Sequence, residues 1–329
     1  MKVIITGGGG FLGSQLATTL LDRGELTGSS GNQEPIEEMV LIDAHFPMPQ
    51  NDPRAQQIVG DISELDMIAP LIVGSKNFCI FHLASMVSGE CEERYDDALR
   101  VNLDGGRNVF EAARASRGRP RVVFASSIAS FGGAAMATPV SDLAKQTPQT
   151  TYGMTKVMCE LMLNDHTRKG YFDGRSARLP TVIIRPGKPN AAASSWASGM
   201  FREPLNSETC NLPVHRNQPH PMTGFRTVVE SFIILHELAE ERLGDDRTYG
   251  LPAHQVTPVM ARNALNELAV EKNLSLGQME DAFDPRIQTI VDSWPTAVDG
   301  KRAVALGLPE PPPLKKIVEQ YLESFGRSE

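Results

Sequence analysis

The sequence lacks the features that mark nucleic-acid binding or membrane insertion. It contains no run of basic residues, and its 32 Lys and Arg against 40 Asp and Glu give a formal net charge of -8. Binding along a nucleic-acid backbone or an anionic membrane is disfavoured, because neutralising phosphate groups requires clustered cations. No apolar stretch approaches the ~20 residues that span a bilayer. Neither partner is expected, which leaves a small-molecule substrate.

Cysteine is also scarce. The four cysteines lie far apart, at Cys79, Cys91, Cys159 and Cys210, with no C-x-x-C pair and no histidine at metal-ligand spacing. This pattern favours reduced thiols in a cytoplasmic protein over a disulfide framework, and no metal site is expected. Met1 and Lys2 lead directly into an apolar run, so no signal peptide is expected either.

Apolar, β-branched runs alternate with helical stretches along the first half of the chain. Strands are expected over residues 2–6, 39–44, 77–85, 121–127 and 181–187, and helices over residues 11–24, 98–116 and 151–170. Continuously apolar strands that alternate with helices indicate a parallel sheet covered on both faces. The predicted fold class is therefore α/β, with a doubly wound parallel sheet.

Four consecutive glycines stand between the first strand and the first helix, in VIITGGGGFLG over residues 3–13. Two registers fit them. Gly8-x-Gly10-x-x-Gly13 is the general dinucleotide-binding spacing, and Gly7-x-x-Gly10-x-x-Gly13 is a looser spacing found in another group of nucleotide-binding enzymes. A glycine turn that opens a helix aims backbone N–H groups at one point and lets a phosphate approach closely. The turn predicts a nucleotide but not a reaction.

The second expected strand ends at Asp43, in VLIDAHF. A carboxylate at this place can accept hydrogen bonds from the adenosine ribose hydroxyls and repels a 2′-phosphate. Ala44 and His45 follow, so no arginine stands there to neutralise such a phosphate. The sequence therefore predicts NAD rather than NADP. A polar insertion over residues 27–38 accounts for the long spacing between the glycines and Asp43.

The composition changes after Gly187. Small residues dominate the stretch 188–208, and several prolines follow. A helix is expected over residues 227–243, and the tail contains LGLPEPPPLKKIVEQYLESF over residues 306–325. We expect residues 1–187 plus about 225–248 to form the NAD-binding domain. Residues 188–224 and 249–329 are expected to form a smaller, mostly helical lobe that binds the substrate.

Tyr152 and Lys156 lie four residues apart in TTYGMTKVMCE, so a helix places both side chains on one face. A phenol near its usual pKa of ~10 is a poor base at neutral pH. A nearby ammonium favours the phenolate, and a positively charged nicotinamide ring would favour it further. Ser126 and Ser127 end the preceding strand, at the sheet edge where ligands bind. We expect these hydroxyls to hold a substrate oxygen.

Together these motifs resemble the extended short-chain dehydrogenase/reductases, a group that includes the nucleotide-sugar epimerases and dehydratases. The resemblance rests on Gly7, Gly10, Gly13, Asp43, Asp61 in VGDI, HLAS at 82–85, Asn102, Ser127, Tyr152 and Lys156. The C-terminal stretch RAVALGLPEPPPLKKIVEQYL is also similar to the pattern of that group. The resemblance implies the glycine register Gly7-x-x-Gly10-x-x-Gly13. It also implies an oxidoreductase mechanism that uses Tyr152 and Lys156.

The resemblance implies a role for each matching position. The pyrophosphate would lie along Gly7, Gly10, Phe11, Leu12 and Gly13, the adenosine ribose at Asp43, the adenine at Asp61 and Ile62, and the middle of the cofactor along Leu83, Ala84 and Ser85. Asn102 would have a structural or cofactor-adjacent role. Lys156 would bind the nicotinamide ribose, Tyr152 would be the acid/base, and Ser127 would orient the reacting hydroxyl.

Two departures from the group's pattern bear on the reaction. Ser127 is followed by Ile128 and Ala129 instead of the Asp–Glu pair of dehydratases, which disfavours elimination of water. RPGK at 185–188 puts Lys188 where nucleotide-sugar enzymes commonly have Asn. A cation there suits a carboxylate on the substrate, and Arg202 and Arg226 fall in the same expected lobe and could join it.

The stretch 178–206 resembles in particular a branch that oxidises the 2-hydroxyl of the four-carbon sugar acid D-erythronate with NAD+. The implied enzyme is an NAD-dependent sugar-acid dehydrogenase, with the carboxylate near Lys188, the C2 hydroxyl held by Ser127 with Ser126, and Tyr152 as the base. Two alternatives stay open. One is a nucleotide-sugar epimerase, and the other is a protein that binds NAD(H) without catalysing a reaction.

The helix expected over residues 151–170 has more apolar surface than one buried stripe requires, at Met154, Val157, Met158, Leu161 and Met162. These side chains either pack in the core or form a homodimer contact together with the helix over 98–116. The family resemblance also implies a homodimer, and the sequence leaves both interpretations open.

Overall fold

The computed structural model describes residues 1–116, 118–189 and 192–326. The chain divides into two compact units. Unit 1 comprises residues 1–130, 150–178 and 229–249, and unit 2 comprises residues 131–149, 179–228 and 250–329. The chain therefore leaves unit 1 at Arg178, before the boundary at Gly187 that the composition indicates, and the segment 131–149 belongs to unit 2.

The main sheet has seven strands in the spatial order β12-β8-β7-β6-β1-β4-β5. Their bounds are β1 (Lys2–Thr6), β4 (Glu38–Asp43), β5 (Ala55–Val59), β6 (Phe78–His82), β7 (Arg121–Ser127), β8 (Asp173–Leu179) and β12 (Thr248–Gly250). Strands β5, β4, β1, β6 and β7 pair in parallel. The order reverses between β1 and β6, where a doubly wound sheet opens a ligand crevice at its carboxyl ends. The predicted fold class is confirmed.

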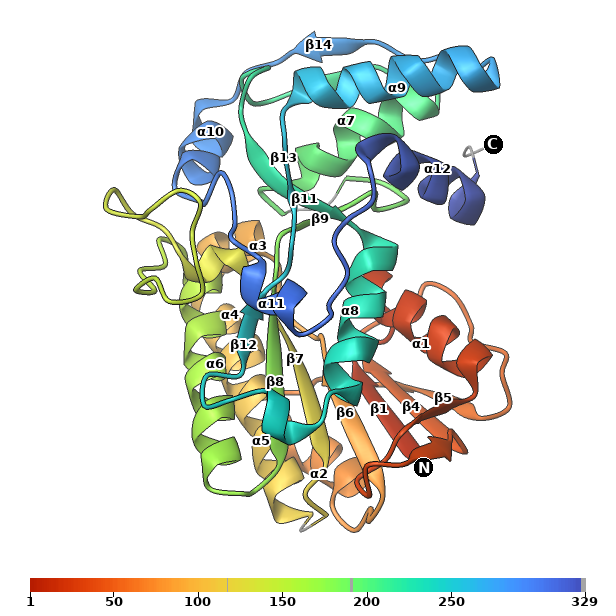
Figure 1. Cartoon of the computed structure of the whole chain (residues 1–329), viewed down its shortest axis with the longest axis vertical. Helices are drawn as coiled ribbons and strands as arrows, with labels where there is room; N and C mark the ends of the chain where they lie inside the picture. The colour runs from red at the N-terminus through yellow and green to blue at the C-terminus, as the bar shows by residue number, and fades with distance from the viewer. Residues whose placement is uncertain (117, 190–191, 327–329) are drawn as a thin grey trace. The chain divides into compact units, whose positions relative to one another are not determined.

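Helices cover both faces of this sheet (Figure 1). On one face lie α1 (Phe11–Arg23) and the second half of α8 (Phe225–Glu237), and on the other lie α2 (Leu65–Ile72), α5 (Gly105–Ala115) and α6 (Thr151–Arg168). Side chains alternate between the two faces of each strand. Ile4, Ile80 and Val122 therefore pack together with Phe110 of α5 and Leu163 of α6 in one solvent-free cluster.

Smaller elements complete unit 1. The polar insertion forms an antiparallel pair of short strands, β2 (Glu25–Thr27) and β3 (Gln33–Pro35). After β6 come α3 (Ser88–Glu93), α4 (Tyr95–Ala98) and a π-helical segment (Leu99–Asp104) that leads into α5. Single 3₁₀ turns lie at Ile128–Ser130 and Glu240–Arg242. None of the helices in the described ranges is long and apolar enough to cross a membrane.

Unit 2 has sheets of its own. One contains β9 (Thr181–Ile183), β11 (His220–Gly224) and β13 (His254–Val256), and the other pairs β10 (Cys210–Leu212) with β14 (Met279–Asp281). Its helices are α7 (Ser195–Leu205), α9 (Pro258–Lys272), α10 (Pro285–Asp292), α11 (Lys301–Ala305) and α12 (Leu314–Phe325). The last of these lies in the C-terminal tail.

The prediction that residues 181–187 form a strand of the main sheet is wrong. That place is taken by β8, and residues 181–183 form β9 in unit 2. β8 lacks the run of apolar residues that predicts the other strands, because its sequence is DGRSARL and two of its buried residues are arginines. Arg175 pairs with Asp173 and donates hydrogen bonds of 2.8 to 2.9 Å to the carbonyls of Leu235, His236 and Leu238 at the end of α8.

Candidate active site

A cavity of about 440 Å³ lies in unit 1 where β1, β4 and β6 end. Most of the predicted cofactor residues line it: Gly7, Gly10, Asp43, Asp61, Ile62, Leu83, Ala84 and Ser85. Phe11, Leu12 and Gly13 form the first turn of α1 beside Gly10. The parallel register brings these segments together, because it sets the ends of β1, β4 and β6 next to one another.

The glycine turn fits a pyrophosphate. Gly7 has a φ of 76°, and a Cβ on Gly13 would stand 2.0 Å from the Gly7 carbonyl oxygen, so both positions require glycine. A Cβ on Gly10 would meet only that oxygen, at 3.2 Å, and Gly10 lines the cavity. Glycine at this position therefore keeps space open for a ligand. Gly9, which neither register includes, is also required, because its Cβ would lie 2.2 Å from the His45 carbonyl oxygen.

The start of α1 adds electrostatic attraction for an anion. Its N-cap residue is Gly10, no side chain caps the helix, and its first turn contains no acidic residue. The N-terminal N–H groups and the helix dipole therefore favour a phosphate group there. At the other side of the turn, Asp43 accepts a hydrogen bond of 3.0 Å from the Gly9 N–H, which fixes its carboxylate at the end of β4.

Asp61 lines the same cavity and is paired. Arg100 donates to its Oδ2 at 2.5 Å, and the Ser63 N–H donates to its Oδ1 at 2.9 Å. Burial acts to raise the pKa of Asp61, but these hydrogen bonds outweigh it and hold the pKa below its usual value. Asp61 therefore stays ionised, and Arg100 is a cavity-lining residue that the sequence motifs do not reveal.

Two buried polar side chains hold the loop Leu83–Met86. Asn102 accepts a 2.7 Å hydrogen bond from the Met86 N–H and donates to the Met86 carbonyl at 3.3 Å. The Thr6 hydroxyl contacts His82 Nδ1 at 2.7 Å and accepts from the Ala84 N–H at 3.3 Å. These contacts are structural, and the π-helical segment carries the Asn102 side chain.

Ser127, Tyr152 and Lys156 come together at the end of β7. Ser127 is its last residue, Tyr152 lies in the first turn of α6, and their hydroxyl groups are hydrogen-bonded. Lys156 lies one turn further along α6. Its Nζ donates to the Ala125 carbonyl at 2.9 Å and lies 5.4 Å from the centroid of the Tyr152 ring. The predicted catalytic residues therefore form one cluster within unit 1.

Burial shifts the pKa of both ionisable groups in this cluster. It raises the pKa of Tyr152 to about 12, although the hydrogen bond from Ser127 acts in the opposite direction. It lowers the pKa of Lys156 to about 8. His82, beside them, has a pKa lowered to about 3, first by burial and then by the charge of Lys156. Tyr152 is therefore a neutral acid in the free protein, and Lys156 is the cation that can stabilise its phenolate.

The NAD dependent epimerase/dehydratase family matches residues 3–216. The chain belongs to this family. It is 40% identical over 326 residues to D-erythronate dehydrogenase of Cupriavidus necator, which covers 99% of each chain. It is 38% identical over 328 residues to the Haemophilus influenzae enzyme of the same name, covering 98% of this chain and 99% of that one. The resemblance found in the sequence is confirmed, and NAD is the cofactor of this family.

Among solved structures, the nucleoside-diphosphate-sugar epimerase from Agrobacterium tumefaciens has a TM-score of 0.88 and 34% identity. The match covers 99% of this chain and 94% of that chain. The likeness therefore extends over nearly the whole chain.

Ser126 does not hold substrate in this family member. Its hydroxyl is 1% exposed and donates to Glu160 of α6, because successive residues of β7 point to opposite faces. Glu160 is itself buried and accepts two hydrogen bonds from Arg178, at 3.1 and 2.9 Å. The prediction for Ser126 is therefore wrong. Glu160, four residues after Lys156, was missed, although its helical spacing in Y-x-x-x-K-x-x-x-E could have indicated it.

The cations predicted for the substrate lie in unit 2 and differ in their surroundings. Lys188 is exposed in the loop after β9. Arg202 is 3% exposed, pairs with Glu203 at 2.5 Å and donates to the Arg185 carbonyl at 3.0 Å. Arg226 pairs with Glu323 of α12 at 2.8 Å. Both arginines are therefore in ion pairs within unit 2, although the Arg226 side chain is 40% exposed. Among the described residues, Lys188 is the one of these three cations for which no ion pair is seen.

Arg185, which opens the RPGK motif, is a cation that the sequence analysis missed. It is half-buried, and its guanidinium donates to the Lys188 carbonyl at 3.2 Å. Burial lowers its pKa, and the neighbouring charge of Arg202 lowers it further. No acidic side chain in the described parts of the chain pairs with it. A half-buried guanidinium without a counter-charge is a suitable partner for a carboxylate.

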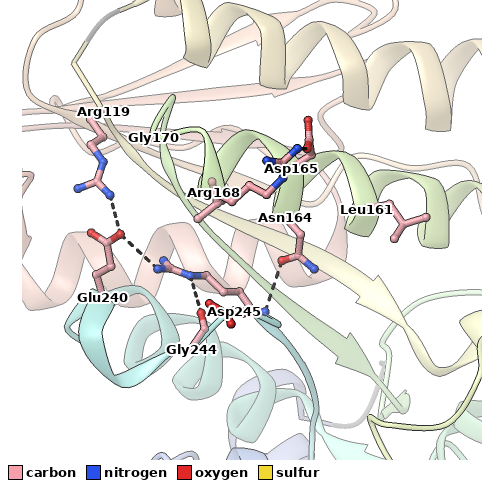
Figure 2. Close-up of a pocket in the computed structure, with 11 residues that line it drawn as sticks. Arg119, Leu161, Asn164, Asp165, Arg168, Gly170, Glu240, Gly244 and Asp245 are labelled. Carbon is pink, nitrogen blue, oxygen red and sulfur yellow. Dashed lines mark hydrogen bonds and ion pairs between the residues drawn. The ribbon is translucent and has the colours of Figure 1, made fainter.

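A second cavity, of about 560 Å³, lies in unit 1 beside the segments that precede β7 and β8. Figure 2 shows Glu240 between two guanidinium groups. Arg119 donates to it at 2.6 Å and Arg247 at 3.2 Å. The backbone N–H of Arg247 also donates to Asn164 at 3.4 Å. Three arginines and three acidic residues line this cavity, so their charges balance, and none of these residues belongs to the predicted cofactor site.

Proposed function

We propose that the protein is an NAD-dependent dehydrogenase that oxidises the C2 hydroxyl of a small sugar acid, D-erythronate, to 2-dehydro-D-erythronate. The observation that carries the proposal is the Ser127–Tyr152–Lys156 cluster at the end of β7, in the unit that also contains the glycine-lined cavity. The identity of 40% to a D-erythronate dehydrogenase over 99% of both chains supports the choice of substrate.

The protein's own residues move one proton. When bound, NAD+ supplies the acceptor for the hydride that leaves C2. Ser127 orients the C2 hydroxyl, and Tyr152 takes its proton. Because burial raises the pKa of Tyr152 to about 12, its phenolate needs nearby positive charge before it can act as a base at neutral pH. Lys156, buried one helical turn away, supplies part of that charge.

We assign the substrate carboxylate to Arg185 and Lys188 of unit 2. Arg185 has no acidic partner in the described residues, and Lys188 is exposed in the same short loop. A planar guanidinium can bind a carboxylate through two parallel hydrogen bonds, which an ammonium cannot do. Arg202 and Arg226, whose charges are already paired, have no part in this assignment.

The direct test follows NADH formation by absorbance with purified protein, NAD+ and D-erythronate. Turnover is expected, and the absence of turnover on every C3–C6 aldonic acid would refute the proposal. Tyr152→Phe is expected to abolish turnover while it leaves NAD+ affinity nearly unchanged. Tyr95→Phe is the matched control, because Tyr95 is a 52% exposed tyrosine of the same unit. Activity retained by Tyr152→Phe would rule out Tyr152 as the base.

The similarity to a nucleoside-diphosphate-sugar epimerase favours one alternative, an epimerase that returns the hydride to its own substrate. An epimerase would interconvert UDP-sugars without net NADH formation and would copurify with tightly held NAD. We expect neither result, because a sugar nucleotide would place no carboxylate beside Arg185 and Lys188. Isothermal titration with UDP-glucose measures this directly.

We further propose a cytoplasmic homodimer. All four cysteines are free and buried, in keeping with a reducing compartment. On α6, Met158 is 40% and Leu161 is 60% exposed, whereas Met162 packs against the core of the sheet. Leu161→Glu is expected to convert the dimer to a monomer in light-scattering measurements of mass. Leu143→Glu, at an 83% exposed leucine of unit 2, is the control that leaves the mass unchanged.

A further inference from the structure

Three consecutive residues at the end of β7 are each bonded to a residue of α6 within unit 1. The pairs are Ala125 with Lys156, Ser126 with Glu160, and Ser127 with Tyr152. The three partners in α6 stand four residues apart, so they form one stripe along the side of the helix that faces the strand. Two of these bonds belong to the catalytic cluster. The third, between Ser126 and Glu160, fixes where α6 lies along β7.

The contact between Ser126 and Glu160 is buried and is held from a third element. Arg178 of β8 donates hydrogen bonds to both carboxylate oxygens of Glu160, at 3.1 and 2.9 Å. All three side chains are less than 5% exposed. A guanidinium that binds a carboxylate through two hydrogen bonds fixes its orientation as well as its position. Glu160 therefore links α6 to β7 on one side and to β8 on the other.

Glu160 also supplies a negative charge beside the catalytic lysine. Burial lowers the pKa of Lys156 to about 8, whereas Cys159, Cys91 and Glu160 act in the opposite direction. Both thiols are neutral at pH 7, because burial raises the pKa of Cys159 to about 12 and that of Cys91, in α3, to about 11.

The other titratable groups around Lys156 are neutral as well. Burial raises the pKa of Tyr152 to about 12 and lowers that of His82, in β6, to about 3. Of the groups named here, Glu160 is therefore the one that is charged at pH 7. A carboxylate near a buried ammonium favours its protonated form.

We infer that Glu160 is a positioning residue for the catalytic pair: through Ser126 and Arg178 it fixes α6 against β7, and its buried carboxylate is the negative charge that faces Lys156. This inference rests on the proposed function, which assigns the base to Tyr152 and the supporting cation to Lys156. Glu160 acts through these residues and does not itself contact the reacting atoms.

The charge of Glu160 is tested without substrate, by a double-mutant cycle in urea unfolding. Glu160→Gln is measured in the wild-type and the Lys156→Met backgrounds, at pH 6 and at pH 10. At pH 6 Lys156 is protonated, so we expect Glu160→Gln to lower the folding equilibrium constant about 10-fold more when Lys156 is present. At pH 10 Lys156 is neutral, and the two reductions should be equal. A role confined to the ion pair with Arg178 would give equal reductions at both pH values.

The same charge should be visible in the pH dependence of the reaction. Without the Glu160 carboxylate, Lys156 loses its proton at a lower pH. The alkaline limb of kcat/KM for D-erythronate is therefore expected to move down by about one pH unit in Glu160→Gln. A loss of stability alone does not move this limb. Glu111→Gln, in the exposed pair with Arg114, is the control and should change neither the limb nor the cycle.

Ser126→Ala tests the link to β7 and keeps both charges of the buried ion pair. We expect kcat to fall about 10-fold, because Lys156 and Tyr152 are then held less closely against the strand end. Ser130→Ala is the matched control. Ser130 is 0% exposed, lies three residues after Ser127, and has a hydroxyl without a hydrogen-bond partner among the described residues. Its kcat should equal that of wild type, and the thermal midpoints of the two variants should be similar.

The outcomes separate this inference from the proposed function. Equal effects of Glu160→Gln in both backgrounds at pH 6 overturn the role of its charge, and a wild-type kcat in Ser126→Ala overturns the positioning through β7. If Glu160→Gln does not fold, Ser126→Ala, which removes a single hydroxyl, decides the matter. Absence of wild-type turnover refutes the proposed function, whereas the unfolding cycle still decides whether Glu160 acts on Lys156.

Discussion

Replacing Lys156 by methionine should inactivate the enzyme and stabilise its fold. The ammonium is 4% exposed, and burial lowers its pKa from 10.5 to about 8. A lysine with a lower pKa in the folded state destabilises the fold whenever it is protonated. The penalty is fully present below pH 8 and disappears as the pH rises towards the unfolded value. The two pKa values correspond to about 3 kcal/mol.

The assay is urea unfolding of wild type and Lys156→Met, without cofactor, at pH 7 and at pH 10. We expect the variant to be more stable at pH 7, by up to about 3 kcal/mol, and the difference to shrink strongly at pH 10. Its kcat/KM should fall by at least about 100-fold, as expected when the charge that supports the base is lost. Lys76→Met, at an exposed lysine of the same unit, is the control and should show little change at either pH.

Two results would contradict this reasoning. A variant no more stable than wild type at pH 7 would mean that the hydrogen bond to the Ala125 carbonyl offsets the whole cost of burying the ammonium. A stability difference that stays constant between pH 7 and pH 10 would mean that Lys156 does not titrate in this range.

Three further predictions concern the cofactor site and its support. Asp43→Asn should raise KM for NAD+ by about 10-fold in initial-rate measurements. It should also reduce the enzyme's preference for NAD+ over NADP+, since the fixed carboxylate repels a 2′-phosphate. An unchanged ratio of kcat/KM for NAD+ to kcat/KM for NADP+ would argue against this role. Gly13→Ala should lower the thermal midpoint because its Cβ would lie 2.0 Å from the Gly7 oxygen, whereas Gly10→Ala should fold normally and bind NAD+ poorly in titrations. Glu160→Gln should cost about 3–5 kcal/mol in urea unfolding because it removes the carboxylate from a buried ion pair with Arg178. Glu111→Gln, in the exposed pair with Arg114, should cost about 1 kcal/mol or less, and equal costs for the two variants would argue against this reasoning.

Most of the main sheet follows from the sequence, because its strands are buried on both faces and read as continuous apolar runs. The predicted strands over residues 2–6, 39–44, 77–85 and 121–127 correspond to β1, β4, β6 and β7. β8 could not be found in this way, because it contains two buried arginines, Arg175 paired with Asp173 of the same strand and Arg178 paired with Glu160 of α6. Charge compensation of this kind depends on tertiary contacts, which local patterning does not contain.

The candidate site also contains residues that the sequence predicts and others that it does not. Glycines, Asp43 and the Tyr–Lys pair follow from spacing, because backbone geometry fixes where such residues stand. The direction in which each side chain points was harder to predict, and Ser126 faces the wrong side of β7 for a substrate ligand. Which cations are free was not predictable either. Arg202 pairs with the adjacent Glu203 and Arg226 with the distant Glu323, whereas Arg185 has no acidic partner among the described residues.

The buried arginines of β8 also impose an order on synthesis. Arg175 needs the carbonyls of Leu235, His236 and Leu238, and its partner Asp173 is shared with Arg247 at 2.7 Å. A guanidinium cannot leave water until such partners are in place. On the ribosome, therefore, the strands from β1 to β7 can pair as they emerge, but the edge of the sheet at β8 must wait for more than sixty further residues. The nascent chain spends that interval with β7 as an open edge, which is where a chaperone would be expected to bind.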